Sequence, residues 1–204
     1  GMSKIPLSGF AMSSLKMAQR FYSAHFRIAY DPLRKAQLDM FTEQKMRDGV
    51  MELMKSDGLY IIGGDFDFRF ETMEAAIHES NPDIVFVDGA YLLRTTGDGR
   101  TEKAANTFDE LKRVAKRNKV PVIATTQFNR EVSANNAASM SIEKLALTDA
   151  AGWTADLAFG IVITDDMRRD KRMIIKPMKF REGFGQDVEC WWDFDTMNFS
   201  ELPT

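Results

Sequence analysis

The sequence holds one cysteine, no long apolar run and no excess of positive charge, and each of these shortages excludes a class of protein. A single cysteine, Cys190, rules out an internal disulfide, so we expect a reducing, cytoplasmic compartment. No apolar stretch approaches the roughly 20 residues of a membrane-spanning helix, and no secretory signal is visible, so we expect no membrane partner. The net charge of −3 argues against a surface coated for nucleic acid, although a local basic patch is compatible with it.

The size and composition are those of one globular domain. With 204 residues, of which 44% are apolar and 28% charged, the chain can bury a substantial core. No internal repeat or linker-like stretch divides it, so residues 2–204 are predicted to form a single domain. We interpret Cys190, which stands beside Trp191, as a core residue rather than a nucleophile.

The most informative stretch runs from Asn81 to Arg94 and reads NPDIVFVDGAYLLR. Its apolar run, Ile84 to Val87, predicts a strand that is covered on both faces, as in the interior of a parallel sheet. The strand ends on Asp88, and in open α/β sheets ligands bind at the carboxyl ends of the strands. A carboxylate at this place can hold Mg²⁺ beside a nucleotide phosphate. The alternative is that Asp88 only caps the following turn.

A second buried strand, Val120 to Thr125, also delivers polar side chains at its carboxyl end. Thr126 and Gln127 follow it directly, at the level of Asp88 in the predicted sheet. Elsewhere, apolar periodicity predicts helices over 13–26, 32–38, 42–56, 71–79 and 102–118. Further strands are predicted at 59–62, 157–163, around 174–175 and at 188–199. The pattern indicates an α/β fold with a mostly parallel core and a C-terminal antiparallel edge hairpin.

Four blocks along the chain resemble, in the same order, the C-terminal RecA-like motor domain of DnaB-type replicative helicases, including those of phages. They read DIVFVDGAYLL, LKRVAKRNKVPVIATTQFNREV, GWTADLAFGIV and MIIKPMKFREGFG. The stretch SLKMAQRFYS aligns more loosely with the helix that follows the family's catalytic glutamate. The resemblance covers roughly residues 12–199, and it implies a RecA-like three-layer core.

This resemblance implies roles for four side chains, with ATP and Mg²⁺ as cofactors. Asp88 would be the Mg²⁺-associated carboxylate at the end of the Walker B strand, and Gln127 the residue that senses the γ-phosphate. Lys179 and Arg181 would be the basic pair that reaches the ATP of a neighbouring subunit. Arg181 suits this role because its planar, permanently charged guanidinium can grip phosphate oxygens bidentately.

The sequence departs from the family's pattern at two places that concern the nucleotide. A P-loop, G-x-x-x-x-G-K-[ST], which cradles phosphates with backbone amides, is absent from the sequence. Ala11 stands where the family's water-activating glutamate aligns. We therefore expect a domain that is N-terminally truncated relative to the family, with an unfilled strand position beside the strand that ends at Asp88. Residues 2–9 could fill this position, a partner chain could supply the strand, or the sheet could close up.

Three functions remain open from the sequence. The first is a DnaB-like helicase motor-domain protein for ATP-dependent DNA unwinding in replication, which needs other helicase subunits or a separate chain that bears the P-loop. The second is a non-catalytic assembly or DNA-binding subunit of a phage or mobile-element replication system that donates Lys179 and Arg181 to a true helicase. The third is an unrelated metal-dependent enzyme that uses Asp65, Asp67 and Asp88.

Contact with single-stranded DNA is a further implication of the resemblance. In the family, loops that face the central channel track the DNA backbone, and the corresponding candidates are Arg94, Arg100 and Arg130. Solvated surface arginines are the alternative for each of them. Because the sequence lacks a phosphate cradle, we expect no measurable ATP hydrolysis by the isolated chain.

Overall fold

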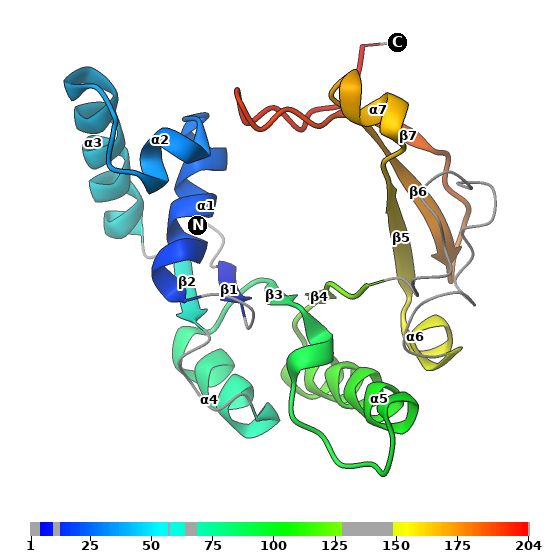
Figure 1. The fold of residues 1–204 in the computed structure, drawn as a ribbon. Coiled ribbons are helices and arrows are strands. Elements are labelled where there is room, and N and C mark those ends of the chain that lie inside the picture. The colour runs from blue at the N-terminus through cyan, green and yellow to red at the C-terminus, as the bar shows by residue number, and fades with distance from the viewer. Residues whose placement is uncertain (1–4, 10–12, 57, 64–68, 128–148, 204) are drawn as a thin grey trace.

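The computed structural model describes residues 5–9, 13–56, 58–63, 69–127 and 149–203. A four-stranded parallel sheet lies at its centre (Figure 1), with the strand order β2-β1-β3-β4. The strands are β1 (Ile5–Gly9), β2 (Leu59–Gly63), β3 (Val85–Asp88) and β4 (Val122–Ala124). Every neighbouring pair is parallel, which confirms the predicted α/β core.

The helices of the N-terminal two thirds of the chain are α1 (Ser14–Phe26), α2 (Tyr30–Arg34), α3 (Met40–Ser56), α4 (Phe70–Ser80), the 3-10 turn η1 (Ala90–Leu92) and α5 (Arg100–Asn118). Of these, α1 contacts β2, and α2 and α3 contact α1. Helices α1, α4 and α5 each end on a residue in the left-handed conformation, namely Arg27, Asn81 and Lys119, a common way to satisfy the last carbonyls. Among the described residues, no helix is both long and apolar enough to cross a membrane.

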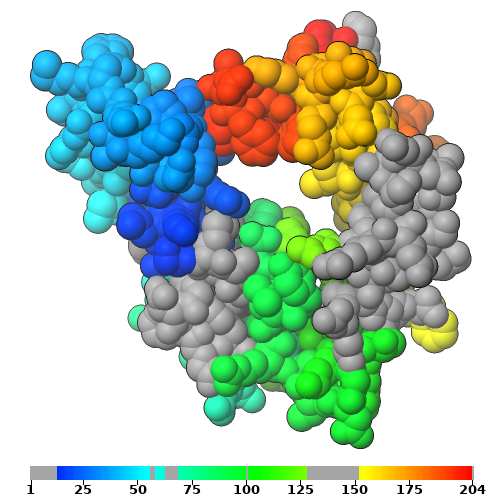
Figure 2. Space-filling model, in the orientation of Figure 1, coloured from blue at the N-terminus to red at the C-terminus, as the bar shows by residue number. Residues whose placement is uncertain are grey.

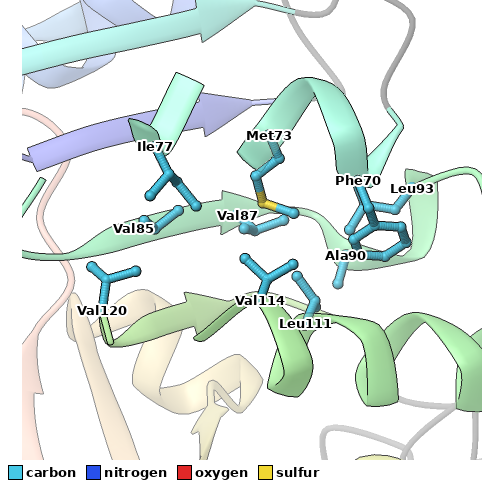
Figure 3. Close-up of a cluster of buried hydrophobic side chains, with 10 residues drawn as sticks. All are labelled: Phe70, Met73, Ile77, Val85, Val87, Ala90, Leu93, Leu111, Val114 and Val120. Carbon is cyan, nitrogen blue, oxygen red and sulfur yellow. The ribbon is translucent and has the colours of Figure 1, made fainter. Parts of the chain in front are cut away.

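The main core lies between β3 and the helices α4 and α5. Figure 3 shows apolar side chains of these three elements meeting on one face of the sheet, with Val87 and Val114 at the centre of the cluster. Both side chains are almost completely buried. Burial of the alternate residues Val85 and Val87 therefore anchors β3 and fixes the position of Asp88 at its end.

The antiparallel strands form a separate three-stranded sheet with the order β5-β6-β7. Its strands are β5 (Leu157–Val162), β6 (Arg172–Phe180) and β7 (Val188–Trp191), with the short helices α6 (Asp149–Thr154) before it and α7 (Asp165–Arg169) between β5 and β6. The antiparallel prediction is confirmed. The predicted last strand was too long, because the Asp193 carboxylate accepts hydrogen bonds from the Asp195 and Thr196 amides and turns the chain.

The strand position beside β3 is occupied, contrary to the unfilled place that the sequence suggested. Residues 5–9 form β1, which pairs with β2 on one side and with β3 on the other, so that Gly9 lies opposite Asp88. Residues from the beginning of the chain thus fill this position, one of the three outcomes considered above. Among the described strands of this sheet, the edges lie at β2 and β4 instead.

Candidate functional site

The candidate site is the carboxyl edge of the parallel sheet. Because the strands are parallel and in register, Gly63, Gly9 and Asp88 end at the same edge. Strand β4 stops at Ala124, and Thr125 continues from the same edge beside them. The predicted meeting of Asp88 with the polar residues after β4 is therefore present in the structure, at the place where open α/β sheets bind ligands.

Asp88 and Thr125 form the centre of this site. The Thr125 hydroxyl donates a hydrogen bond of 2.5 Å to Asp88 Oδ1. The backbone supports the contact, since the Thr125 amide donates to the Val87 carbonyl at 2.9 Å and the Ala90 amide donates to the Thr125 carbonyl at 2.9 Å. Two strand ends are thereby joined, which holds the partly buried carboxylate in one orientation.

Gln127 lies at the same edge and contacts η1. Its side-chain Nε2 donates to the Tyr91 hydroxyl at 3.3 Å, a long hydrogen bond between two exposed side chains. Next to it, Thr126 Oγ1 is buried and has no hydrogen-bond partner among the residues described. The site thus contains an amide that is held only weakly, beside a buried hydroxyl.

The donor set of this edge suits a magnesium-bound phosphate. Mg²⁺ takes one or two protein carboxylates and fills its other positions with water and phosphate oxygens. Asp88, with its neighbouring hydroxyls, offers this kind of oxygen set. In the part of the chain that the structure describes, no cluster of three or more His, Cys, Asp or Glu forms an all-protein metal cage.

Lys179 and Arg181 belong to the antiparallel sheet, away from the Asp88 edge in the fold. Lys179, at the end of β6, donates from Nζ to the carbonyls of Gly152 and Trp153 in the last turn of α6. Such a contact satisfies carbonyls that the helix leaves open and matches the negative end of its dipole. Lys179 therefore has partners within the chain.

Asp156 is the acidic partner of Arg181. The Arg181 Nη1 lies 2.9 Å from Asp156 Oδ1, and the Arg181 amide donates to the Asp156 carbonyl at 2.9 Å. Lys112 of α5 forms a second ion pair with the same carboxylate. The Lys112 hydrogen bond, helped by the charges of Lys112 and Arg181, holds the pKa of Asp156 below its ordinary value. The Arg181 side chain stays 54% exposed, so it is oriented but accessible.

Of the three predicted DNA-contacting arginines, Arg94 is the one whose side-chain surroundings the structure describes. Arg94 follows η1 and lines a surface pocket of about 600 Å³ together with Arg69 and Arg113. Three acidic residues of α4 and α5 line the same pocket, namely Glu71, Asp109 and Glu110, so its charge is mixed. Arg100 is the first residue of α5. Arg130, and with it Ala11, Asp65 and Asp67, lies outside the described residues.

The side chains that hold the candidate residues in place were not predicted from the sequence. Tyr91 and Thr125 orient Gln127 and Asp88, and Lys112 and Asp156 orient Arg181. Thr125 could have been found, because it is the last residue of a predicted strand that ends at the level of Asp88. The pairing of Asp156 with Arg181 depends on strand register, which the sequence pattern leaves open.

Comparisons with known proteins bear on the family and the fold of the chain. The family profile described as "DnaB-like helicase C terminal domain" matches residues 3–201. A solved structure of an ATPase domain superposes with a TM-score of 0.83 at 18% identity, over 98% of this chain and 75% of that chain. A DnaB-like replicative helicase, solved to show its interactions with primase, gives a TM-score of 0.84 at 19% identity.

The second of these matches covers 98% of this chain and 51% of the helicase chain, so the chain spans about half of that protein. At these identities the two structures establish the RecA-like helicase fold. Among curated proteins, none matches the sequence significantly.

Proposed function

The chain belongs to the DnaB-like helicase C-terminal domain family, and on this premise we propose that it is a motor-domain protein for ATP-dependent DNA unwinding in replication. The observation that carries the proposal is the hydrogen bond between Thr125 and Asp88 at the carboxyl edge of the parallel sheet. The carboxylate, hydroxyls and amide gathered at this edge support the proposal, because open α/β sheets bind ligands at the carboxyl ends of their strands.

Each residue at this edge has a defined task in the proposal. Asp88 would hold Mg²⁺ through its carboxylate, directly or through water. Mg²⁺ held by Asp88 would supply positive charge that offsets the negative charge of the phosphate oxygens. Thr125 keeps the Asp88 carboxylate in one orientation, since its hydroxyl occupies Oδ1. The Gln127 amide can exchange its long bond to Tyr91 for a phosphate oxygen.

The basic pair would act on the nucleotide of a neighbouring subunit. Arg181 is more than half exposed and is held by Asp156 at the end of β6, so its guanidinium is presented toward solvent. An exposed ion pair is worth little, about 1 kcal/mol or less, and phosphate oxygens can compete for the arginine. Lys179 supports this position because it ties the end of β6 to the last turn of α6.

The sequence contains no phosphate cradle, so the proposed motor needs a P-loop from polypeptide outside these residues. A second candidate is a non-catalytic subunit that donates Arg181 to an active helicase. The alanine at position 11, where the family has its catalytic glutamate, favours this candidate. The two candidate functions differ in one respect, because only the motor would use Asp88 for ATP turnover.

ATP binding and hydrolysis by the purified chain, with Mg²⁺ and single-stranded DNA, test the proposal. We expect no turnover by the isolated chain and turnover after a P-loop-bearing chain of this family is added. Asp88→Asn should abolish that turnover. If the mixture hydrolyses ATP equally well with Asp88→Asn but loses activity with Arg181→Ala, the non-catalytic role is correct and the motor role is wrong.

A further inference from the structure

Phe184 has the highest exposure of the large apolar side chains among the described residues, at 93%. It lies in the connection between β6 and β7, with Gly183 before it and Gly185 after it. A phenyl ring that stays in water gains no hydrophobic stabilisation from the fold. The surroundings of the ring decide whether it is an isolated surface residue or part of a site.

The backbone of this connection is fitted against the end of β6. A Cβ added at Gly185 would lie 2.7 Å from the Phe180 ring, so the Gly185 backbone lies directly against that ring. Phe180 in turn packs edge-to-face on Phe159 of β5, with ring centroids 5.5 Å apart. Gly183 has a φ of +87°, in the left-handed region that glycine adopts without strain. The connection is therefore folded back on the sheet, and Phe184 is presented to solvent from it.

Arg181 lies three residues before Phe184 on the same connection. Three residues span at most about 11 Å of extended chain, so one short piece of backbone presents both the guanidinium and the phenyl ring. Asp156 holds the guanidinium at 2.9 Å, and 54% of the Arg181 side chain stays exposed. A small ligand that carries both an anionic group and a flat ring therefore matches this pair, because the guanidinium binds the anion and the phenyl face stacks on the ring.

A single nucleotide fits this pair better than a strand of nucleic acid does. Two neighbouring lysines are already engaged, since Lys176 lies 3.6 Å from Asp187 and Lys179 donates to carbonyls of α6. Glu182 adds a negative charge directly after Arg181. A polynucleotide needs many cations along its backbone, whereas a nucleotide needs one strong contact to its phosphates and one ring on which its base can stack.

We propose that Phe184 is a base-binding residue that stacks on the nucleobase of the nucleotide whose phosphates Arg181 reaches. The inference rests on the function proposed above, in which Arg181 acts on the nucleotide of a neighbouring subunit. It extends that function, because a phosphate contact carries no information about the base, whereas a contact to the base does. Purines present the larger ring face, so Phe184 favours purine over pyrimidine nucleotides.

Nuclear magnetic resonance of the 204-residue chain with Mg²⁺-ATP is the first arm of the test. The two contacts alone give weak binding, with a Kd of the order of 1 mM. ATP should shift the Phe184 ring resonances, which are identified by their loss in Phe184→Leu. Inorganic triphosphate should shift the Arg181 guanidinium resonance and leave the Phe184 ring unchanged. A Phe184 ring that stays unshifted at about 10 mM ATP overturns the proposal.

Phe41 is the matched control, since its side chain is 80% exposed and it lies on α3. Figure 2 shows α3, in blue to cyan, on the opposite side of the molecule from the yellow and orange parts that contain the antiparallel sheet. ATP should leave the Phe41 ring unshifted. Equal shifts of both rings would mean that ATP stacks on any exposed phenyl group, which contradicts a site at Phe184.

An adenine oligonucleotide separates a free nucleotide from a nucleic-acid strand, because both carry the same base. At equal nucleotide concentration, we expect ATP to shift the Phe184 ring more than the oligonucleotide does, since the surrounding lysines are engaged and offer a strand little charge. A larger shift with the oligonucleotide would make this connection a contact for single strands and would overturn the proposal.

Steady-state kinetics of the chain mixed with a P-loop-bearing chain of the same family are the second arm. Phe184→Ala should raise KM for ATP about fivefold or more and leave kcat unchanged, because stacking on the base stabilises substrate and transition state equally. The ratio of kcat/KM for ATP to that for CTP should fall toward one. Phe184→Trp should keep both properties, Phe41→Ala should change neither, and thermal melting should show that each variant is folded. An unchanged KM and an unchanged preference for ATP in Phe184→Ala overturn the proposal.

The base contact and the motor function can fail separately, because the resonance shifts are measured without turnover. Shifts of the Phe184 ring without turnover in the mixture would support the base contact and refute the motor. Asp88-dependent turnover whose KM does not respond to Phe184→Ala would support the motor and refute the base contact.

Discussion

The hydroxyl of Thr125 donates to the carboxylate of Asp88 over 2.5 Å, and this contact joins the ends of two parallel strands at the candidate phosphate site. Asp88 itself ends a strand whose Val85 and Val87 side chains are buried in the core with residues of α4 and α5. The geometry of the carboxylate therefore depends on the core and on one hydroxyl.

Removing that hydroxyl should impair function more than stability. Thr125→Val keeps the shape of the side chain but leaves Asp88 without its donor, a charge-assisted bond worth about 1.5–3 kcal/mol. We expect ATP turnover by the complemented motor to fall about tenfold or more, and Thr125→Ser to restore most of it. Equal turnover by the valine and wild-type proteins would show that the contact does not orient Asp88.

The ion pairs of Asp156 should make a small, pH-dependent contribution to stability. The pKa of Asp156 is lowered in the folded chain from an ordinary value of 3.8, chiefly by the Lys112 hydrogen bond. The contribution is therefore fully present above about pH 4 and is lost as the pH falls through the folded-state pKa. Since the carboxylate is half exposed, solvent screening keeps it below about 1 kcal/mol.

Asp156→Asn tests this expectation by urea unfolding at two pH values. The stability difference between wild type and variant should be larger at pH 7 than at pH 3, because pH 3 lies below the ordinary pKa of 3.8 and protonation there favours the unfolded chain. A difference that is unchanged or larger at pH 3 would contradict the assigned ion pairs.

Truncation of a side chain in the core beside β3 should lower stability far more than truncation on the exposed face of α3. Leu111 is buried against β3 and α4, so Leu111→Ala should cost about 2–5 kcal/mol of unfolding free energy. Met54→Ala, at an exposed apolar position, should change it by less than about 0.5 kcal/mol. Chemical denaturation of both variants provides the comparison, and similar losses would argue against the described core.

The thiol of Cys190 should be unreactive in the native chain. The side chain is 3% exposed, and burial raises its pKa, so little thiolate is available near neutral pH. Labelling by a thiol reagent should be at least about tenfold slower than in the unfolded chain. Rapid labelling without denaturant would show that the C-terminal strands open readily.

The sequence predicted those features that depend on strong local patterns. The run Ile84 to Val87 indicated a buried strand, and Asp88 and Gln127 were identified because each follows such a strand. Strand β1 was missed, since its five residues include a proline, a serine and a glycine and show no clear alternation. Pairing with β2 and β3 on both sides decides its conformation, and only the tertiary structure supplies those neighbours.

The partners of Arg181 were not predictable for a related reason. Asp156 precedes β5 and Arg181 follows β6, and they meet because Leu157 pairs with Phe180 in the antiparallel register. A shift of one residue would place the two side chains on opposite faces of the sheet. The residue types indicated the chemistry, whereas the register determined which charges meet.

The decisive measurement for the proposed motor is ATP hydrolysis by the chain, alone and with a P-loop-bearing chain of the same family. We predict no turnover by the isolated chain, turnover after complementation, and loss of that turnover with Asp88→Asn. Turnover by the isolated chain, or complemented turnover that survives Asp88→Asn, would contradict this prediction.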